Sequence, residues 1–210
     1  MQQPYNSISA FFDCYGLSNA RSILCKMIKT ADSEISWKST SPSHLLYFTE
    51  KMKELIKAAF SIVNSYDYKN EVILQKQENE HTWSLKEYQH YCSSHVRYTP
   101  WHFFPRYLSK KEFLDPYKAL EKFTQYQSLA KWKHTLKELL HHALSSVSIH
   151  EFNEATGILH IYIHLHKLIE ATHLIAIRSD AEQPKSNILK WKDRIQPESK
   201  HEVQQTSLNK

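Results

Sequence analysis

Only two of the 210 residues in this chain are glycine, and this feature restricts the fold more than any other. Sheets joined by tight turns use many residues with positive φ, which glycine adopts most easily, whereas helices joined by short polar loops do not. The seven prolines fall mostly between segments with helical periodicity, where they can end helices. The sequence therefore predicts an all-α protein.

The segment from Ser148 to Arg178 contains the longest apolar run of the chain. At about 100° of rotation per residue, its apolar side chains form two stripes on different sides of a helix. One stripe contains Ile158, Ile161, Tyr162, Leu165, Leu168, Ile169 and Ala176, and the other contains Leu159, Ile163, Leu174 and Ile177. A helix that is covered on two sides lies inside a bundle. We predict an antiparallel bundle of about six helices around a central helix at 149–178, with two helical subdomains joined by an aromatic linker as an alternative.

Composition divides the chain into four parts. We expect an N-terminal helical part at 1–95 and an aromatic, proline-containing linker at 96–108. Residues 109–179 should form a C-terminal helical hairpin that carries the central helix, and residues 180–210 a polar, mostly mobile tail. The linker is too apolar to extend freely into water, so we expect it to dock onto the bundle.

Several helix boundaries have local signals. Gly16 is a weak point in an otherwise helical pattern, so residues 7–29 should form either one helix or two. Ser43 follows a proline and is a candidate N-cap. Ser109 and Glu112 have the spacing of a capping box, in which each side chain bonds to the backbone N–H of the other residue.

The three cysteines, Cys14, Cys25 and Cys92, are widely separated and include no CxxC pair. This pattern is typical of proteins in a reducing compartment. The amino-terminal residues lack the basic segment and continuous apolar core of a signal peptide. The longest apolar stretch contains Lys167 and Glu170, which are costly at the middle of a bilayer. We therefore expect a cytoplasmic protein with no membrane partner.

Eight of the 14 histidines lie between His134 and His173. His160 and His164 are one helical turn apart, so both imidazoles can point the same way and bind a divalent metal. The third ligand could be Glu154, or His141 or His142 of the preceding helix. The HxxxH spacing lacks the glutamate that serves as the catalytic base in HExxH. We favour the alternative, in which the histidines are partly buried and hydrogen-bonded at helix contacts, so no metal and no cofactor is predicted.

Arg97 and His102 form an R-x4-H string in the aromatic linker. In this pair and in its helical character, the chain resembles the HEPN helical-bundle ribonucleases, whose R-x4-6-H pair lies on a helix and contacts the scissile phosphate. The resemblance implies a role for Arg97 and His102 in RNA cleavage. Pro100 lies between them, and we favour the alternative that both are ordinary loop residues.

The sequence contains no GxGxxG, GxxxxGKS/T or GxSxG motif. The formal charge of +5 is spread along the chain, which gives weak support for a nucleic-acid partner. The surface that we expect to contact a partner contains Trp101, Phe103, Phe104 and Arg106. We therefore predict a non-catalytic helical protein that acts through a protein partner or self-association. The alternative is a HEPN-like ribonuclease or nucleic-acid-binding protein.

Overall fold

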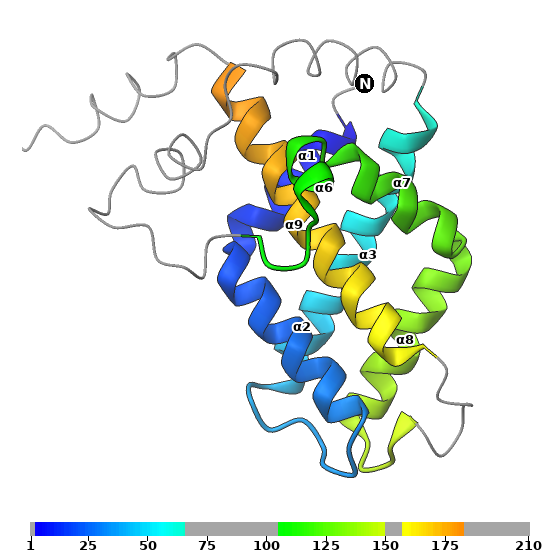
Figure 1. The fold of residues 1–210 in the computed structure, drawn as a ribbon. Helices are drawn as coiled ribbons and strands as arrows, with labels where there is room; N and C mark the ends of the chain where they lie inside the picture. The colour runs from blue at the N-terminus through cyan, green and yellow to red at the C-terminus, as the bar shows by residue number, and fades with distance from the viewer. Residues whose placement is uncertain (1–2, 66–104, 150–156, 183–210) are drawn as a thin grey trace, which may run out of the picture.

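The computed structural model describes residues 3–65, 105–149 and 157–182, and in these ranges the chain forms seven α-helices and no strand. In chain order the helices are α1 (Gln3–Cys14), α2 (Leu17–Ala31), α3 (Pro42–Asn64), α6 (Lys110–Leu114), α7 (Tyr117–Tyr126), α8 (Leu129–Leu144) and α9 (Ile158–Glu182). They pack against one another as a bundle (Figure 1). The prediction of an all-α bundle is confirmed.

The central position of α9 is also confirmed. This helix contacts α1, α2, α3, α6 and α7, and it crosses the middle of the bundle in Figure 1. Its most deeply buried apolar side chains are Leu165, Leu168, Ile169, Ala171 and Leu174. Leu159, which we assigned to a covered stripe, is 64% exposed. It lies in the first turn of α9, on the side that faces away from the other helices.

The predicted start of the central helix at residue 149 is wrong. Gly157 has a φ of 138°, which L-residues rarely adopt, and the helix begins immediately after it. The carbonyl oxygen of Gly157 accepts the first helical hydrogen bond, from the N–H of Ile161 at 2.8 Å. The positive φ of this glycine therefore sets the boundary of α9. Residues 150–156 lie outside the described ranges.

The amino-terminal segment forms two helices that separate at Gly16, which is one of the two predicted alternatives. Gly16 is the N-cap residue of α2 and has φ −60° and ψ 152°, an extended conformation. The prediction of Ser43 as the N-cap of the next helix is wrong, because Pro42 already occupies its first turn and Ser41 is the N-cap residue. Proline is favoured in a first turn, since the N–H that it lacks has no helical partner there.

The capping box at the start of α6 is confirmed. Ser109 Oγ accepts from Glu112 N at 3.3 Å, and Glu112 Oε2 accepts from Ser109 N at 2.9 Å. Glu112 is also fully buried and accepts from Lys122 Nζ and Lys167 Nζ, each at 2.8 Å. One carboxylate therefore caps α6 and connects it to α7 and α9.

The helix α8 joins the amino-terminal and carboxy-terminal parts of the bundle. It packs chiefly against α2 and α3, and the backbone N–H of Trp37, in the loop between those two helices, donates to Ala143 O at 2.8 Å. Trp132 is fully buried, stacks on Phe123 with ring centroids 4.3 Å apart, and donates from Nε1 to Phe123 O at 3.2 Å. Helices from both parts of the chain thus share one buried cluster.

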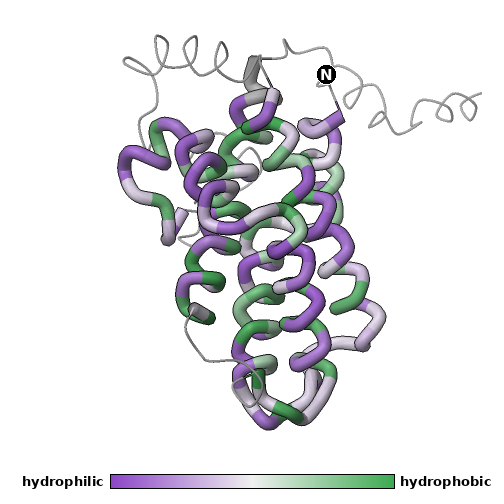
Figure 2. Tube along the Cα trace, turned by 90° about the vertical axis from the view of Figure 1, so that its right-hand side faces the viewer, coloured by the Kyte–Doolittle hydropathy of each residue, from purple (hydrophilic) through white to green (hydrophobic). Residues whose placement is uncertain are grey.

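Hydrophilic and hydrophobic residues alternate along the helices (Figure 2). This alternation is typical of helices that bury one side and expose the other. Of the helices in the described ranges, none combines the length and the hydrophobicity that crossing a membrane would require. Of the predicted aromatic linker, residues 105–108 are described, and they lie directly before α6.

Candidate functional site

Glu170 of α9 fixes the position of the segment that precedes α6. Its side chain is fully buried and accepts hydrogen bonds from two directions. Arg21 Nη1 donates at 2.8 Å, and the backbone N–H groups of Arg106, Tyr107 and Leu108 donate at 2.9, 2.9 and 3.3 Å. A buried carboxylate needs such donors, because an unpaired charge in the interior is costly. These bonds hold the segment against α2 and α9.

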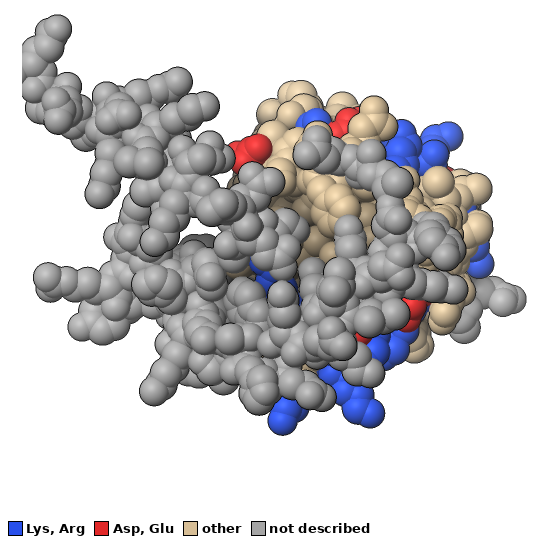
Figure 3. Space-filling view, turned by 90° about the horizontal axis from the view of Figure 1, so that it is seen from above, with Lys and Arg blue, Asp and Glu red and all other residues tan. Residues whose placement is uncertain are grey.

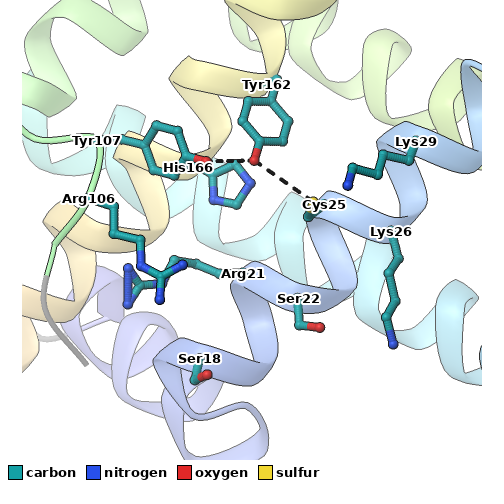
Figure 4. A pocket seen from close by; sticks show the side chains of 10 residues that line it. All are labelled: Ser18, Arg21, Ser22, Cys25, Lys26, Lys29, Arg106, Tyr107, Tyr162 and His166. Atoms are coloured by element: carbon teal, nitrogen blue, oxygen red, sulfur yellow. Dashed lines mark hydrogen bonds between the residues drawn. The ribbon is translucent and has the colours of Figure 1, made fainter. Parts of the chain in front are cut away.

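A cleft of about 370 Å³ opens between α2, α9 and this segment (Figure 4). Its volume lies within the range of pockets that bind small ligands or parts of larger ones. Tyr162 and His166 line it from α9, and Arg106 and Tyr107 line it from the segment. The position of the cleft therefore depends on the contacts that Glu170 makes with its neighbours.

One face of α2 forms a wall of the cleft. The wall residues recur at intervals of three and four positions, with two adjacent pairs among them, so they lie on one side of the helix. They are Ser18, Arg21, Ser22, Cys25, Lys26 and Lys29. Another face of α2 carries Leu24, Met27 and Ile28, which are buried in the core. The polar side of α2 therefore faces the cleft, and its apolar side packs in the core and holds the helix in place.

The cleft carries positive charge. Its cationic side chains are Arg21, Lys26, Lys29 and Arg106, and no residue described as lining it is acidic. At the end of the bundle seen in Figure 3, acidic side chains occur beside some of the visible Lys and Arg side chains. Cations that share one concave surface concentrate positive potential, which attracts anions.

A hydrogen-bonded chain of side chains borders the cleft. The hydroxyl oxygens of Tyr107 and Tyr162 are 2.6 Å apart, and the Tyr162 hydroxyl donates to Cys25 Sγ at 3.9 Å (Figure 4). Burial, and then the hydrogen bond with Tyr107, raise the pKa of Tyr162, so this phenol keeps its proton at neutral pH. Tyr162 therefore adds aromatic surface to the cleft without negative charge.

His166 forms the floor of the cleft. It is 2% exposed, and its ring stacks on Tyr107 with centroids 4.6 Å apart. Within the described ranges, neither Nδ1 nor Nε2 has a hydrogen-bond partner. Burial, and then the charges of Arg21 and Arg106, lower the pKa of His166 to about 4, so the ring is neutral at pH 7. Buried polar atoms normally have partners, so these two nitrogens are an exception among the described residues.

The two histidines predicted as metal ligands have different surroundings. His160 is exposed, whereas the ring of His164 stacks on Tyr126 of α7 with centroids 4.2 Å apart. Burial, and then the charge of Lys167, lower the pKa of His164. Glu154 lies outside the described residues, and among the residues inside them no group of three His, Cys, Asp or Glu side chains is arranged to hold a metal. The metal site stays the alternative that the sequence favours less.

Most of the other predicted site residues also lie outside the part of the chain that the structure describes. These residues are Arg97, Trp101, His102, Phe103 and Phe104. Arg106, predicted as part of a partner surface, is exposed and lines the cleft. The structure places it beside Arg21, because the backbone N–H of Arg106 and the Arg21 guanidinium bond to the same oxygen of Glu170.

Several cleft residues were not predicted as site residues from the sequence: Arg21, Lys26, Lys29 and His166. A helix face rich in lysine looks the same whether it faces a cleft or bulk water. The signal that could have found the site is Glu170, an acid in the middle of an apolar run, because a buried carboxylate requires donors from other segments.

Comparison with protein-family models, with curated proteins and with solved structures gave no match. The fold and the site together define an all-α protein with a cationic cleft.

Proposed function

We propose that this chain is a nucleic-acid-binding protein whose cleft holds the phosphate backbone of a single strand. The observation that carries the proposal is the concentration of cationic side chains on one concave surface, with no acidic side chain among its described lining residues. Such a surface attracts anions and excludes ligands that carry net positive charge.

The spacing of the cations favours a polyanion over a small anion. Arg21, Lys26 and Lys29 lie on one face of α2, and the rise of 1.5 Å per residue gives them a span of roughly 12 Å along the helix axis. A single phosphate group is too small to contact all three side chains, whereas successive phosphates of a strand follow such a row. Each phosphate that a Lys or Arg neutralises adds affinity by releasing counterions.

Aromatic rings lie beside these cations. Tyr107 and Tyr162 are both partly exposed, and both line the cleft. Proteins that bind single strands combine a cationic groove with aromatic side chains on which bases stack. A cleft bounded by two helices and a loop segment also suits one flexible strand better than a stiff duplex. The aromatic and cationic residues together support a single-stranded partner.

The described surface supports a protein partner less well. Large exposed apolar side chains are dispersed over a loop and four helices, and single exposed residues of this kind are normal in monomeric proteins. They are Ile35, Leu46, Tyr47, Leu114, Tyr126 and Leu159. A cytoplasmic location remains part of the proposal, because Cys14 and Cys25 are free thiols.

Fluorescence anisotropy with a labelled, single-stranded RNA tests the proposal. We expect binding by the wild-type protein to weaken with salt, with a slope of log K against log salt of about −0.7 for each phosphate contacted. The K26E/K29E double variant reverses the charges of two exposed lysines at the rim of the cleft. We expect it to bind the RNA at least about tenfold more weakly than the wild type.

The matched control is the K57E/K137E double variant. Lys57 on α3 and Lys137 on α8 are exposed and do not line the cleft, so the net charge changes equally while the cleft stays intact. Equal losses in the two double variants would contradict a specific role for the cleft. A phosphopeptide of the same charge is the comparison ligand, and tighter binding to it than to RNA would contradict a nucleic-acid partner.

A further inference from the structure

The floor of the cleft contains an imidazole whose hydrogen-bonding capacity is not used by the described residues. His166 is 2% exposed, and both of its ring nitrogens are shielded from water as well as unpaired within those residues. In Figure 4 the ring lies below the tyrosine pair and on the side of the cleft where Arg21 and Arg106 extend. Leaving a buried donor and acceptor unsatisfied is costly, and a bound group that reaches the floor removes that cost.

We propose that Arg21, Arg106 and His166 form a subsite for a terminal phosphate monoester, so that a strand enters the cleft by its phosphorylated end. This subsite rests on the proposed function and specifies the substrate class of the same cleft. Within it, the two guanidinium groups and a neutral imidazole N–H supply donors, and the phosphate supplies acceptor oxygens. The rim lysines then contact the phosphates that follow.

The charge at the floor matches a monoester. Glu170 Oε1 accepts from Arg21 Nη1 at 2.8 Å and from the backbone N–H of Arg106 at 2.9 Å, so one buried carboxylate holds both arginines at this end of the cleft. Guanidinium groups bind phosphate through paired N–H donors and are favoured at such sites over single-point cations. The two arginine charges exceed the single negative charge of Glu170, so the floor keeps net positive charge. A terminal phosphate carries more negative charge than a phosphodiester and therefore gains more from this charge.

The depth of the floor favours a chain end. Arg21 is 6% exposed and His166 2% exposed, whereas Lys26 and Lys29 at the rim are exposed. An internal phosphodiester reaches such a depth only if the sugars on both of its sides enter a cleft of about 370 Å³. A terminal phosphate is attached to one sugar, so only that sugar has to enter the cleft with it. The exposed side chain of Arg106 can move aside to admit it.

The subsite also links binding to protonation. The charged and titratable groups around the imidazole are Arg21 and Cys25 of α2, Arg106 and Tyr107 of the preceding segment, and Tyr162 and Glu170 of α9. Burial and the two arginines keep His166 neutral at pH 7 by lowering its pKa to about 4. A phosphate dianion beside the ring favours its charged form, so the pKa rises on binding and the complex takes up protons as the pH falls.

Three short RNAs of one sequence test the subsite: one with a 5′-phosphate, one with a 3′-phosphate and one with hydroxyl groups at both ends. We expect wild-type protein to bind one of the phosphorylated strands about tenfold more tightly than the hydroxyl strand, since a charge-assisted contact is worth about one such factor. Equal affinity for all three strands overturns the subsite and leaves nucleic-acid binding intact, whereas failure of every strand to bind overturns the proposed function as well.

Two variants test which side chains produce the preference for the phosphorylated strand. Arg106→Gln changes an exposed side chain, and His166→Phe keeps a ring that can stack on Tyr107 but removes both ring nitrogens. We expect both variants to lose the preference, while His160→Gln, an exposed position on the same helix, retains it. Retention of the preference in Arg106→Gln and His166→Phe overturns the assignment. Thermal melts confirm that each variant is folded.

Competition identifies the source of the phosphate. AMP, adenosine and inorganic phosphate are each added to the complex with the phosphorylated strand. Displacement by AMP and not by adenosine supports the subsite and shows that a nucleotide end is recognised. Equal displacement by inorganic phosphate supports the subsite and shows that the phosphate group alone is recognised. Displacement by none of them, or by adenosine as well as AMP, overturns it.

Discussion

Arg21 on α2 and Glu170 on α9 form a buried ion pair, in which Nη1 and Oε1 are 2.8 Å apart. The two side chains are 7% and 0% exposed, although the residues are 149 positions apart in the sequence. The same carboxylate accepts the backbone N–H groups of residues 106–108. Glu170 therefore joins the wall of the cleft, the segment that borders it and the central helix.

Replacement of Glu170 by alanine should destabilise the protein strongly. The change leaves the Arg21 guanidinium buried without its carboxylate and removes the acceptor of three backbone donors, a loss of about 3–5 kcal/mol in the free energy of unfolding. Urea unfolding measures this loss. The control is Glu50→Ala, which removes a surface ion pair with Lys53 and should cost less than about 1 kcal/mol. Similar losses in the two variants would contradict the anchoring role of Glu170.

Glu112 should control stability in strong acid. Burial alone would raise the pKa of Glu112, but hydrogen bonds from Lys122, Lys167 and Ser109 outweigh it and lower the pKa from 4.5 to about 2. A carboxylate with a lowered pKa stabilises the fold above its unfolded pKa, and this stabilisation is lost as the pH falls through the folded value. We expect the wild type to lose stability between about pH 4.5 and 2 more steeply than Glu112→Gln. Urea midpoints at successive pH values test this, and parallel curves would count against it.

His166 and His173 should destabilise the fold in mild acid. Burial, and then the charge of Arg21, lower the pKa of His173 to about 4, and His166 has a similarly lowered pKa. Between pH 6.5 and 4 the unfolded chain binds more protons than the folded chain, so stability falls as the pH drops through this window. His173→Phe, which keeps a ring beside Phe12, should make that pH dependence shallower. An unchanged slope in His173→Phe would refute the explanation.

The two glycines should respond differently to alanine. Gly157 has a φ of 138°, so Gly157→Ala strains the backbone and should cost about 1–3 kcal/mol. Gly16 has a φ of −60° and no neighbour within 4 Å of an added Cβ. Alanine at position 16 makes the unfolded chain less flexible, which stabilises the fold, but it is a poorer N-cap residue than glycine, which destabilises it. Because the two effects oppose each other, Gly16→Ala should change the free energy of unfolding by less than about 0.5 kcal/mol. Thermal unfolding compares the two, and equal losses would contradict the assigned start of α9.

Local features of the fold were predictable from the sequence. The scarcity of glycine indicated helices, Gly16 indicated the first break, and Ser109 with Glu112 indicated the start of α6. Each of these depends on backbone preferences or on hydrogen bonds within a few residues, so the pattern contains the information. The start of α9 was missed because glycine tolerates both helical and positive φ, and the apolar pattern does not choose between them.

The cleft was not predictable, because it depends on contacts between distant segments. Arg106 bonds to a carboxylate 64 positions away, and Arg21 bonds to the same carboxylate 149 positions away. His166 belonged to a group of histidines expected to be partly buried and hydrogen-bonded at helix contacts, but its ring stacks on Tyr107 of the segment before α6, and its nitrogens have no partner among the described residues. The unpaired state of its nitrogens within the described residues became visible only when α2, α9 and the intervening segment were placed together.

Cross-linking is the most direct test of where a strand lies. Ultraviolet irradiation of the wild-type protein with single-stranded RNA, followed by digestion and mass spectrometry, identifies the peptides attached to nucleotides. We predict attachment to peptides that contain Tyr107, Tyr162 or the cleft face of α2, and loss of that attachment in the K26E/K29E double variant. Attachment confined to peptides from α3 or α8, unaffected by the double variant, would contradict the central claim that the cationic cleft binds the strand.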